Sequence, residues 1–238
     1  HFGTGALALD LEPGRGLTDA IDNPGRIDGL FIERAMIRAN DNLAILSAEA
    51  PISSPLMTDG AAFLQLEEEF REAFEATVID MPRNMLINFP QLVNDVNVVV
   101  LVTEYTLASA RDSIRILSWL RTNAPQARVI VVANKVQSAV SEIGKADFEA
   151  SIEAKVALTI PYDAKAAALA AKLGQTFADA NRTTKAGSAM RDLSQLILEG
   201  RDDVQDAGEG KKASLFDKLD LKSFMSGMGT KKASAQAQ

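Results

Sequence analysis

The sequence predicts an α/β fold with a mostly parallel central sheet and helices on both of its faces. Short runs of apolar, often β-branched residues alternate along the chain with longer segments whose apolar residues recur at helical spacing. The most β-branched run, residues 96–102, lacks the apolar-polar alternation of a half-exposed strand, as expected for a strand covered on both faces. Connections between these segments are short, which is typical of successive βαβ units.

Composition narrows the class of protein further. The chain has 238 residues, a formal net charge of −7 and 47% apolar residues, which is enough for one large domain with its own core. No apolar run is long enough to cross a bilayer, and we expect no signal peptide. The absence of cysteine excludes a disulfide framework and favours a reducing, cytoplasmic setting. The acidic balance argues against nucleic-acid binding over the whole surface.

Residues 1–200 and 201–238 are predicted to be a folded domain and a flexible tail. Residues 201–212 are polar and are predicted to be a linker, and the apolar residues of Ser214–Met225 fall on two sides of a helical wheel. A membrane-surface helix is therefore disfavoured against a partner-binding or disordered tail. The chain begins with His1 and a glycine-rich turn, so we expect it to be the carboxy-terminal part of a longer protein. Gly3, Gly5 and Ala8 match a dinucleotide motif, but no strand precedes them, so that site is disfavoured.

In the first third of the chain, prolines and glycines separate short helices expected at 17–21 and 29–34. Residues 43–46 are predicted as a short strand after the turn at 40–42. Thr58 or Asp59 is suited to cap a helix that runs to Phe74. Its core stripe is Phe63, Leu66, Phe70 and Phe74, and its solvated side is Glu67, Glu68, Glu69 and Glu72.

A short buried strand is predicted at Thr77–Ile79, because all three residues are β-branched. It ends at Asp80, since Pro82 cannot donate to a sheet. A loop or short helix is expected at 84–94. Further strands are predicted at 96–102, 129–133 and 156–160, and further helices at 106–121, 146–154, 164–173 and 185–199. The buried stripes of the helices at 106–121 and 185–199 are predicted to be Leu107, Ala110, Ile114 and Leu117, and Met190, Leu193 and Ile197.

Polar residues follow three of the predicted strands. Asp80, Asn134 and Pro161-Tyr162-Asp163 lie just past carboxyl ends, which meet at one edge of a parallel sheet, where ligands bind. An acid suits Mg²⁺ or its water shell, and an asparagine amide suits the edge of a purine. The structural alternatives are a solvated Asp80, a left-handed turn at Asn134 and an N-cap at Asp163. The convergence of all three favours a nucleotide site.

One motif bears on which base this nucleotide carries. Ala133-Asn-Lys-Val-Gln137 resembles the Asn-Lys-x-Asp guanine motif of GTPases, but Gln137 replaces the carboxylate that reads guanine. GTP is therefore disfavoured.

Together, Val78-Ile-Asp-Met-Pro-Arg83, the 96–102 strand, Asn134 and Pro161–Asp163 resemble the deviant-Walker ATPases of the ParA/MinD family. Within it, the Asp-x-Pro-Arg form and the opening Phe2-Gly-Thr-Gly-Ala-Leu-Ala-Leu-Asp-Leu-Glu-Pro-Gly14 are most similar to the CpaE/TadZ pilus-assembly proteins. The resemblance covers roughly residues 1–200 and implies a P-loop NTPase fold whose first strand and P-loop precede His1. No G-x-x-x-x-G-K-[ST] motif occurs in the 238 residues.

The resemblance also implies roles for individual residues. Asp80 matches the Walker B acid that holds Mg²⁺, and Phe2, Gly3 and Pro82 match positions beside the nucleotide. Asn134 and Lys135 match an adenine-contacting site, and Pro161, Tyr162 and Asp163 match the loop beside the base. Asp112 falls where MinD-like proteins place dimer-interface residues, with an exposed helical aspartate as the alternative.

As a whole, the resemblance implies a homodimer that binds ATP and Mg²⁺ and acts with other pilus-assembly proteins in building or placing type IV (Flp/Tad) pili. It implies a place in the cytoplasm, at the cell pole or the inner-membrane face, with at most peripheral membrane contact and no specific nucleic acid. A non-catalytic scaffold of the same fold and a ParA-like partitioning ATPase are the alternatives. The partitioning ATPase calls for a clustered basic patch, for which Lys211-Lys212 and Lys231-Lys232 are thin support.

Overall fold

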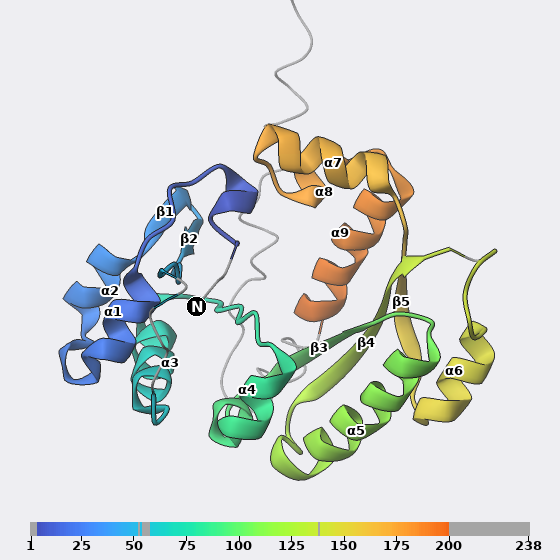
Figure 1. Ribbon diagram of the computed structural model, residues 1–238, viewed down its shortest axis with the longest axis horizontal. Coiled ribbons are helices and arrows are strands. Elements are labelled where there is room, and N and C mark those ends of the chain that lie inside the picture. The colour runs from blue at the N-terminus through green and yellow to red at the C-terminus, as the bar shows by residue number, and fades with distance from the viewer. Residues whose placement is uncertain (1–3, 52, 54–57, 138, 200–238) are drawn as a thin grey trace, which may run out of the picture. The chain divides into compact units, whose positions relative to one another are not determined.

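The computed structural model describes residues 4–51, 53, 58–137 and 139–199 (Figure 1). Its helices are α1 (Gly16–Asp22), α2 (Gly29–Ala35), α3 (Ala61–Ala73), α4 (Arg83–Asn88), α5 (Leu107–Asn123), α6 (Lys145–Ile152), α7 (Ala164–Leu173), α8 (Phe177–Ala180) and α9 (Lys185–Leu198). Its strands are β1 (Ile37–Asn40), β2 (Leu43–Ile45), β3 (Val98–Thr103), β4 (Arg128–Val136) and β5 (Val156–Pro161). Short 3-10 helices lie at η1 (Leu7–Leu9), η2 (Pro24–Arg26) and η3 (Pro90–Val93).

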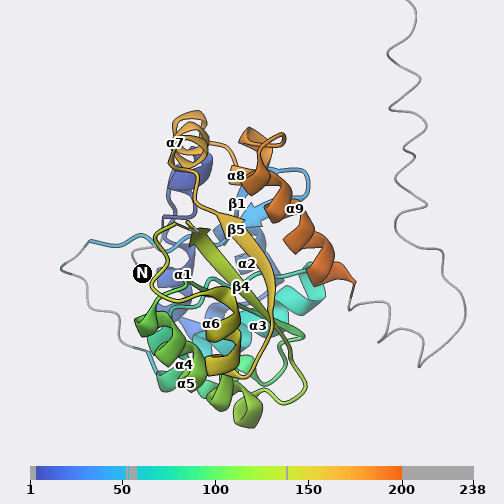
Figure 2. The ribbon, with the colours of Figure 1, turned by 90° about the vertical axis from the view of Figure 1, so that its right-hand side faces the viewer.

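The three longest strands form a parallel sheet in the order β3-β4-β5. Val98 pairs with Arg128 and Thr103 with Ala133, so β3 and β4 run in register along the whole of β3. One face packs on α5 and α6, where Leu101 and Val131 meet Leu117 and Phe148. The opposite face packs on α9, and Figure 2 shows α9 and α6 on opposite sides of β5. The predicted α/β fold, with helices on both faces of a parallel sheet, is confirmed.

A second, smaller core is built by the first part of the chain. Ile21 of α1, Ile32 of α2 and Leu66 of α3 are buried together. Beside them, β1 and β2 pair as an antiparallel hairpin, and the Asn40 side chain accepts a 2.9 Å hydrogen bond from the Asn42 N–H in its turn. The turn at 40–42 and the strand after it were predicted. β1 was not, because Ile37-Arg-Ala-Asn40 has too few apolar residues to stand out.

The strand predicted at Thr77–Ile79 is wrong. These residues form no strand and are exposed, with 95% of Val78 and 46% of Ile79 accessible to solvent. A strand needs a hydrogen-bonded neighbour, and no described residue pairs with this segment. β3 is at the edge of its sheet, and among the described residues nothing pairs with its outer side. Its Val102 is 58% exposed, so β3 is not covered along its whole length.

Two helix predictions also need correction. In α5, Leu107 and Ile114 are exposed, and the buried stripe is Ala110, Ser113, Leu117 and Leu120. Ser113 can be buried because its hydroxyl lies 3.1 Å from that of Thr103, so each satisfies the other. In α3, Glu67 is only partly solvated: one of its carboxylate oxygens is buried and has no partner among the described residues. Phe2, Gly3 and the tail at 201–238 lie outside the described residues.

Candidate functional site

Asn134 and Lys135 lie near the end of β4, at the carboxyl edge of the sheet. The register between β4 and β5 shifts between Ala133 and Val136, so the strand bends there. Lys135 has a φ of 51°, the left-handed conformation, and the Asn134 side-chain oxygen accepts a 2.8 Å hydrogen bond from the Lys135 N–H. The left-handed turn considered for Asn134 therefore falls on its neighbour. The Asn134 amide nitrogen donates no hydrogen bond to a described residue.

The loop that follows β5 is joined to the end of β4. The Tyr162 N–H donates a 3.0 Å hydrogen bond to the carbonyl of Val136, which brings Tyr162 next to the residues after Asn134. The Tyr162 side chain is 50% exposed. Asp163 begins α7, and its carboxylate accepts a 2.9 Å hydrogen bond from the Ala166 N–H. The N-cap considered as an alternative for Asp163 is confirmed.

Residues after β3 complete this edge, although the sequence analysis did not single them out. The Lys135 ammonium pairs with Glu104 at 3.2 Å. The Tyr105 hydroxyl lies 3.4 Å from that of Thr159 in β5, and the Tyr105 ring packs edge-on against Phe148. The signal was available, because Glu104 and Tyr105 follow β3 just as Asn134 ends β4. All three strand ends are therefore linked by side chains.

Asp80 does not follow a strand, so no strand places it at this edge of the sheet. It is exposed, lies in the extended segment between α3 and α4, and forms no hydrogen bond or ion pair with any described residue. Pro82 immediately precedes α4, where an extended conformation at the N-cap starts the helix. Of the three predicted strand ends, the structure brings together those at Asn134 and at Pro161–Asp163.

A polar hollow of about 390 Å³ lies elsewhere in the described residues. Asn40, Gln175, Thr176 and Asp179 are among the residues that line it, and none of the predicted site residues does so. The Thr176 hydroxyl, followed by Arg182, holds the pKa of Asp179 below its usual value. The carboxyl edge therefore remains the candidate site, because it gathers the predicted residues.

Comparison with known proteins identifies the architecture. No protein-family model matches the chain, and neither does any curated protein sequence. Among solved structures, a ParA family ATPase of Chlorobium tepidum superposes with a TM-score of 0.71 at 16% identity, covering 81% of this chain and 79% of that one. The fold is that of the ParA/MinD ATPases.

Two MinD structures agree with this ParA/MinD fold. The MinC:MinD cell division complex of Aquifex aeolicus superposes with a TM-score of 0.63 at 16% identity, covering 88% of this chain and 80% of the other. The septum site-determining protein MinD of Pyrococcus horikoshii, complexed with Mg-ADP, superposes with a TM-score of 0.57 at 15% identity, covering 81% and 77%. At these identities the likeness establishes the fold.

The residues of this ParA/MinD-like chain fit one half of a Mg²⁺-nucleotide. The Asn134 amide nitrogen has no partner among the described residues and the Tyr162 ring is exposed, and both groups are of kinds that contact purine bases in proteins. The phosphate half does not fit: the sequence lacks a P-loop motif, and no three acidic or histidine side chains gather as a metal site within the described part of the chain. Asp80 stands apart as a single carboxylate. The described edge is therefore suited to a base and not to the phosphates or the metal.

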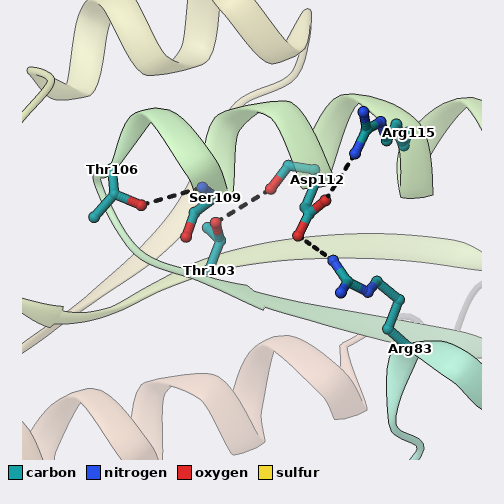
Figure 3. Close-up of polar contacts among 7 residues, drawn as sticks. Arg83, Thr103, Thr106, Ser109, Asp112 and Arg115 are labelled. Atoms are coloured by element: carbon teal, nitrogen blue, oxygen red, sulfur yellow. Dashed lines mark hydrogen bonds and ion pairs between the residues drawn. The ribbon is translucent and has the colours of Figure 1, made fainter.

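Asp112 of α5 and Arg83 of α4 form a polar cluster (Figure 3). One carboxylate oxygen of Asp112 accepts a hydrogen bond from Arg83, at the start of α4, and the other lies 3.4 Å from Arg115. The Thr106 hydroxyl caps α5 by accepting a 3.1 Å hydrogen bond from the Ser109 N–H. Asp112 is thus engaged within its own chain, and its place in a dimer interface stays a prediction.

Proposed function

We propose that this chain belongs to an ATP-binding protein of the ParA/MinD type that acts, like the CpaE/TadZ proteins it resembles, in assembling or placing type IV (Flp/Tad) pili. The observation that carries the ATP-binding part is the joined carboxyl edge, where Tyr162 is tied to the end of β4 beside Asn134. The fold supports it, because ParA and MinD ATPases are among the structures that superpose on the chain. The pilus role is supported by the Val78–Arg83 and Phe2–Gly14 motifs.

The adenine would lie against the ends of β4 and β5. The Asn134 amide nitrogen has hydrogens to donate to ring nitrogens of the base, since only its oxygen is occupied, by the Lys135 N–H. The Tyr162 ring offers an aromatic face at the same edge. The neighbouring Lys135–Glu104 pair would remain at the rim, where the ribose would pass.

This site would need a further strand beside β3 and a P-loop, a motif that the 238 residues lack. No described residue pairs with the outer side of β3, and the segment Thr77–Ile79, with its Val78 exposed, lies in the same chain. A strand that paired with β3 would form hydrogen bonds with the backbone groups of that edge. The other side of this added strand would then be open to pairing with Thr77–Ile79. Asp80 would then end a strand at the carboxyl edge, as the Walker B role requires.

The partners follow from the same comparison. One superposed structure is a complex of MinD with MinC, and we propose that this protein likewise forms a homodimer and engages pilus-assembly proteins. It would work in the cytoplasm, at the pole or at the inner-membrane face. Within the described residues no helix has the length and apolar character to cross a membrane.

Saturation-transfer NMR with millimolar ATP tests the base site in the chain as it exists. We expect saturation of the adenine protons to exceed that of the ribose protons, and GTP to show less. Asn134→Ala and Tyr162→Ala should each reduce the adenine signal, while Asn88→Ala, at the exposed end of α4, should leave it unchanged. Equal signals from the three variants would remove the base site and favour the non-catalytic scaffold.

The pilus role needs its own experiment. In the host bacterium, deletion of the gene should reduce surface pili or displace them from the pole, as counted by electron microscopy. Complementation with the wild-type gene should restore them. Normal pili in the deletion strain, together with unequal partition of a plasmid or chromosome, would favour the ParA-like alternative.

A further inference from the structure

One side of α7 presents two lysines and two leucines to solvent. Lys165, Leu169, Lys172 and Leu173 lie within about 100° of the helix circumference, at 3.6 residues per turn, and all four are exposed. Among the described residues, neither lysine forms an ion pair. Alanines occupy the other exposed positions of α7, so a second helix can approach closely. We call these four residues the α7 face.

A complementary set of residues lies on α3. Leu64, Glu68 and Glu72 recur every four residues on its exposed side, and we call them the α3 face. In the part of the chain that the structure describes, neither glutamate is in an ion pair. Arg71 beside them does not neutralise them, because its guanidinium pairs with Asp95 at 3.2 Å. The α3 face therefore offers a leucine and two carboxylates to a basic, partly apolar partner.

The spacing of the two faces matches when the helices are antiparallel. Leu173 lies ~12 Å along α7 from Lys165, at 1.5 Å per residue. Leu64 likewise lies ~12 Å along α3 from Glu72. An antiparallel pair that sets Lys165 beside Glu72 therefore sets Leu173 beside Leu64. A parallel pair would instead set a leucine beside a charged side chain at each end.

The middle of each face fits the same alignment. Lys172 falls between the positions of Glu68 and Leu64, and its flexible four-carbon stem allows its ammonium to reach the Glu68 carboxylate. The stems of both lysines can also lie along the leucines and cover part of their apolar surface. Two ion pairs and one leucine pair would thus form along a single helix contact.

We propose that the α7 face of one copy of this chain packs antiparallel on the α3 face of a second copy. Both faces are exposed in the same chain, so neither covers the other, and a second copy supplies the complement that each lacks. The opposite charges set the choice and the orientation of the partner, and burial of the leucines holds the contact together.

This contact is head-to-tail, because its two faces differ. A copy that joins through its α7 face keeps its own α3 face open, so assembly continues beyond a dimer unless it closes into a ring. The ion pairs are exposed, so the contact is weak and is screened by salt. It needs no nucleotide, which separates it from the homodimer of an ATP-binding protein.

Analytical ultracentrifugation of the 238-residue chain without nucleotide tests the contact. We expect the average mass to rise with protein concentration at low salt and to fall when salt is added. Lys165→Glu/Lys172→Glu and Glu68→Lys/Glu72→Lys should each weaken association about tenfold or more, because both ion pairs become repulsive. An equimolar mixture of the two variants should associate again, because each supplies the charge that the other lacks.

The matched control reverses two exposed cations away from both faces. Arg121→Glu/Lys185→Glu, on α5 and α9, changes the net charge as much as Lys165→Glu/Lys172→Glu does and should leave association unchanged. A loss of association in this control equal to that in the α7 variant would assign the effect to net charge and overturn the proposal.

Other results would also overturn the contact between α7 and α3. One is a chain that stays monomeric at every concentration in low salt. Another is a mixture of the two charge-reversed variants that fails to associate although circular dichroism shows that both are folded. Growth that stops at the dimer would point to a two-fold contact. Association that strengthens with salt and persists in Lys165→Glu/Lys172→Glu would point to the apolar edge of β3.

Discussion

Glu67 is one residue through which the stability of this fold depends on pH. It lies on α3, half buried, and one of its carboxylate oxygens has no partner among the described residues. Burial raises the pKa of Glu67 to about 7, an effect that Arg71 opposes and Asp95 reinforces. Arg71 does not rescue the carboxylate, because its guanidinium pairs with Asp95 at 3.2 Å.

The free energy of unfolding should therefore fall as pH rises from about 4.5 to about 7. In that window the native state holds a proton that the unfolded state has released, so raising the pH favours unfolding. After allowance for solvent screening, we expect a loss on the order of 1 kcal/mol. Glu67→Gln should flatten this slope in urea titrations at several pH values, and Glu68→Gln, on the exposed side of α3, should retain it. An unchanged slope in Glu67→Gln would contradict the assignment.

Asp80 and Asp163 provide a matched pair of aspartates with opposite expectations. Asp80 is exposed and makes no contact through its carboxylate among the described residues, so Asp80→Ala should change the stability of this chain by less than about 0.5 kcal/mol. Asp163→Ala removes the cap of α7 and should cost about 0.5–2 kcal/mol. Thermal unfolding of both variants makes the comparison. A large loss of stability in Asp80→Ala would show that the Asp80 carboxylate has a structural role.

At the scale of elements, α7, α8 and α9 are held together by one buried asparagine. Asn181 is 4% exposed, and its amide donates hydrogen bonds of 3.0 and 3.1 Å to the carbonyls of Ala166 in α7 and Phe177 in α8. Its own carbonyl lies so close to Gly187 of α9 that a side chain there would clash with it. The contact between these helices thus depends on an amide and on a glycine.

Asn181→Ala should lower the free energy of unfolding by about 1–3 kcal/mol, because one buried and one partly buried carbonyl lose a donor. Asn123→Ala is the matched control. The Asn123 amide also donates to a backbone carbonyl, that of Trp119, but from a partly exposed helix end, so its loss should cost less. Denaturant titrations compare the two. Equal losses would mean that the burial of Asn181 adds nothing to the free energy of unfolding.

Elements whose signals are local could be predicted from the sequence. β3, β4 and β5 are runs of β-branched residues, and α7 is an alanine-rich helix after a capping aspartate, so each appeared near its predicted bounds. Thr77–Ile79 has the same local signal, but no described strand pairs with it. Strand formation depends on pairing with residues that are distant in sequence, which local composition cannot reveal.

The candidate site could likewise be predicted only where its signals are local in the sequence. Asn134 and Asp163 were placed at the sheet edge because they end predicted strands. The bond between Tyr162 and Val136 and the left-handed backbone of Lys135 depend on how β4 and β5 shift in register, which composition does not encode. Likewise, Arg83 and Asp112 are 29 positions apart, and only the packing of α4 beside α5 joins them.

For the whole molecule, removal of residues 200–238 should leave folding intact. The buried clusters lie within the described residues before Glu199, and the tail sequence lacks both helical periodicity and a continuous apolar face. Limited proteolysis should remove the tail, and the truncated chain should keep a cooperative thermal transition in circular dichroism. Loss of that transition would assign the tail to the core.

The 238-residue chain should neither hydrolyse ATP nor bind it tightly. Charge-assisted hydrogen bonds contribute roughly 1.5–3 kcal/mol each, so the lack of even three phosphate contacts would cost roughly 5–9 kcal/mol. Each 1.4 kcal/mol is about tenfold in affinity, so a micromolar site would weaken beyond millimolar. Calorimetric titration with ATP-Mg²⁺, with phosphate release followed in parallel, measures both. Low-micromolar binding or turnover above the blank would show that the phosphate site was misplaced.

The side of β3 with which no described residue pairs also bears on how this chain behaves in a crowded solution. An uncapped apolar strand is a template on which another copy can add its own strand, the first step of ordered aggregation. Val98–Thr103 carries no charge or proline that would discourage such addition. Repulsion between copies of charge −7 opposes it, and salt weakens that repulsion. The colloidal stability of the chain therefore depends on its net charge for as long as β3 lacks a partner.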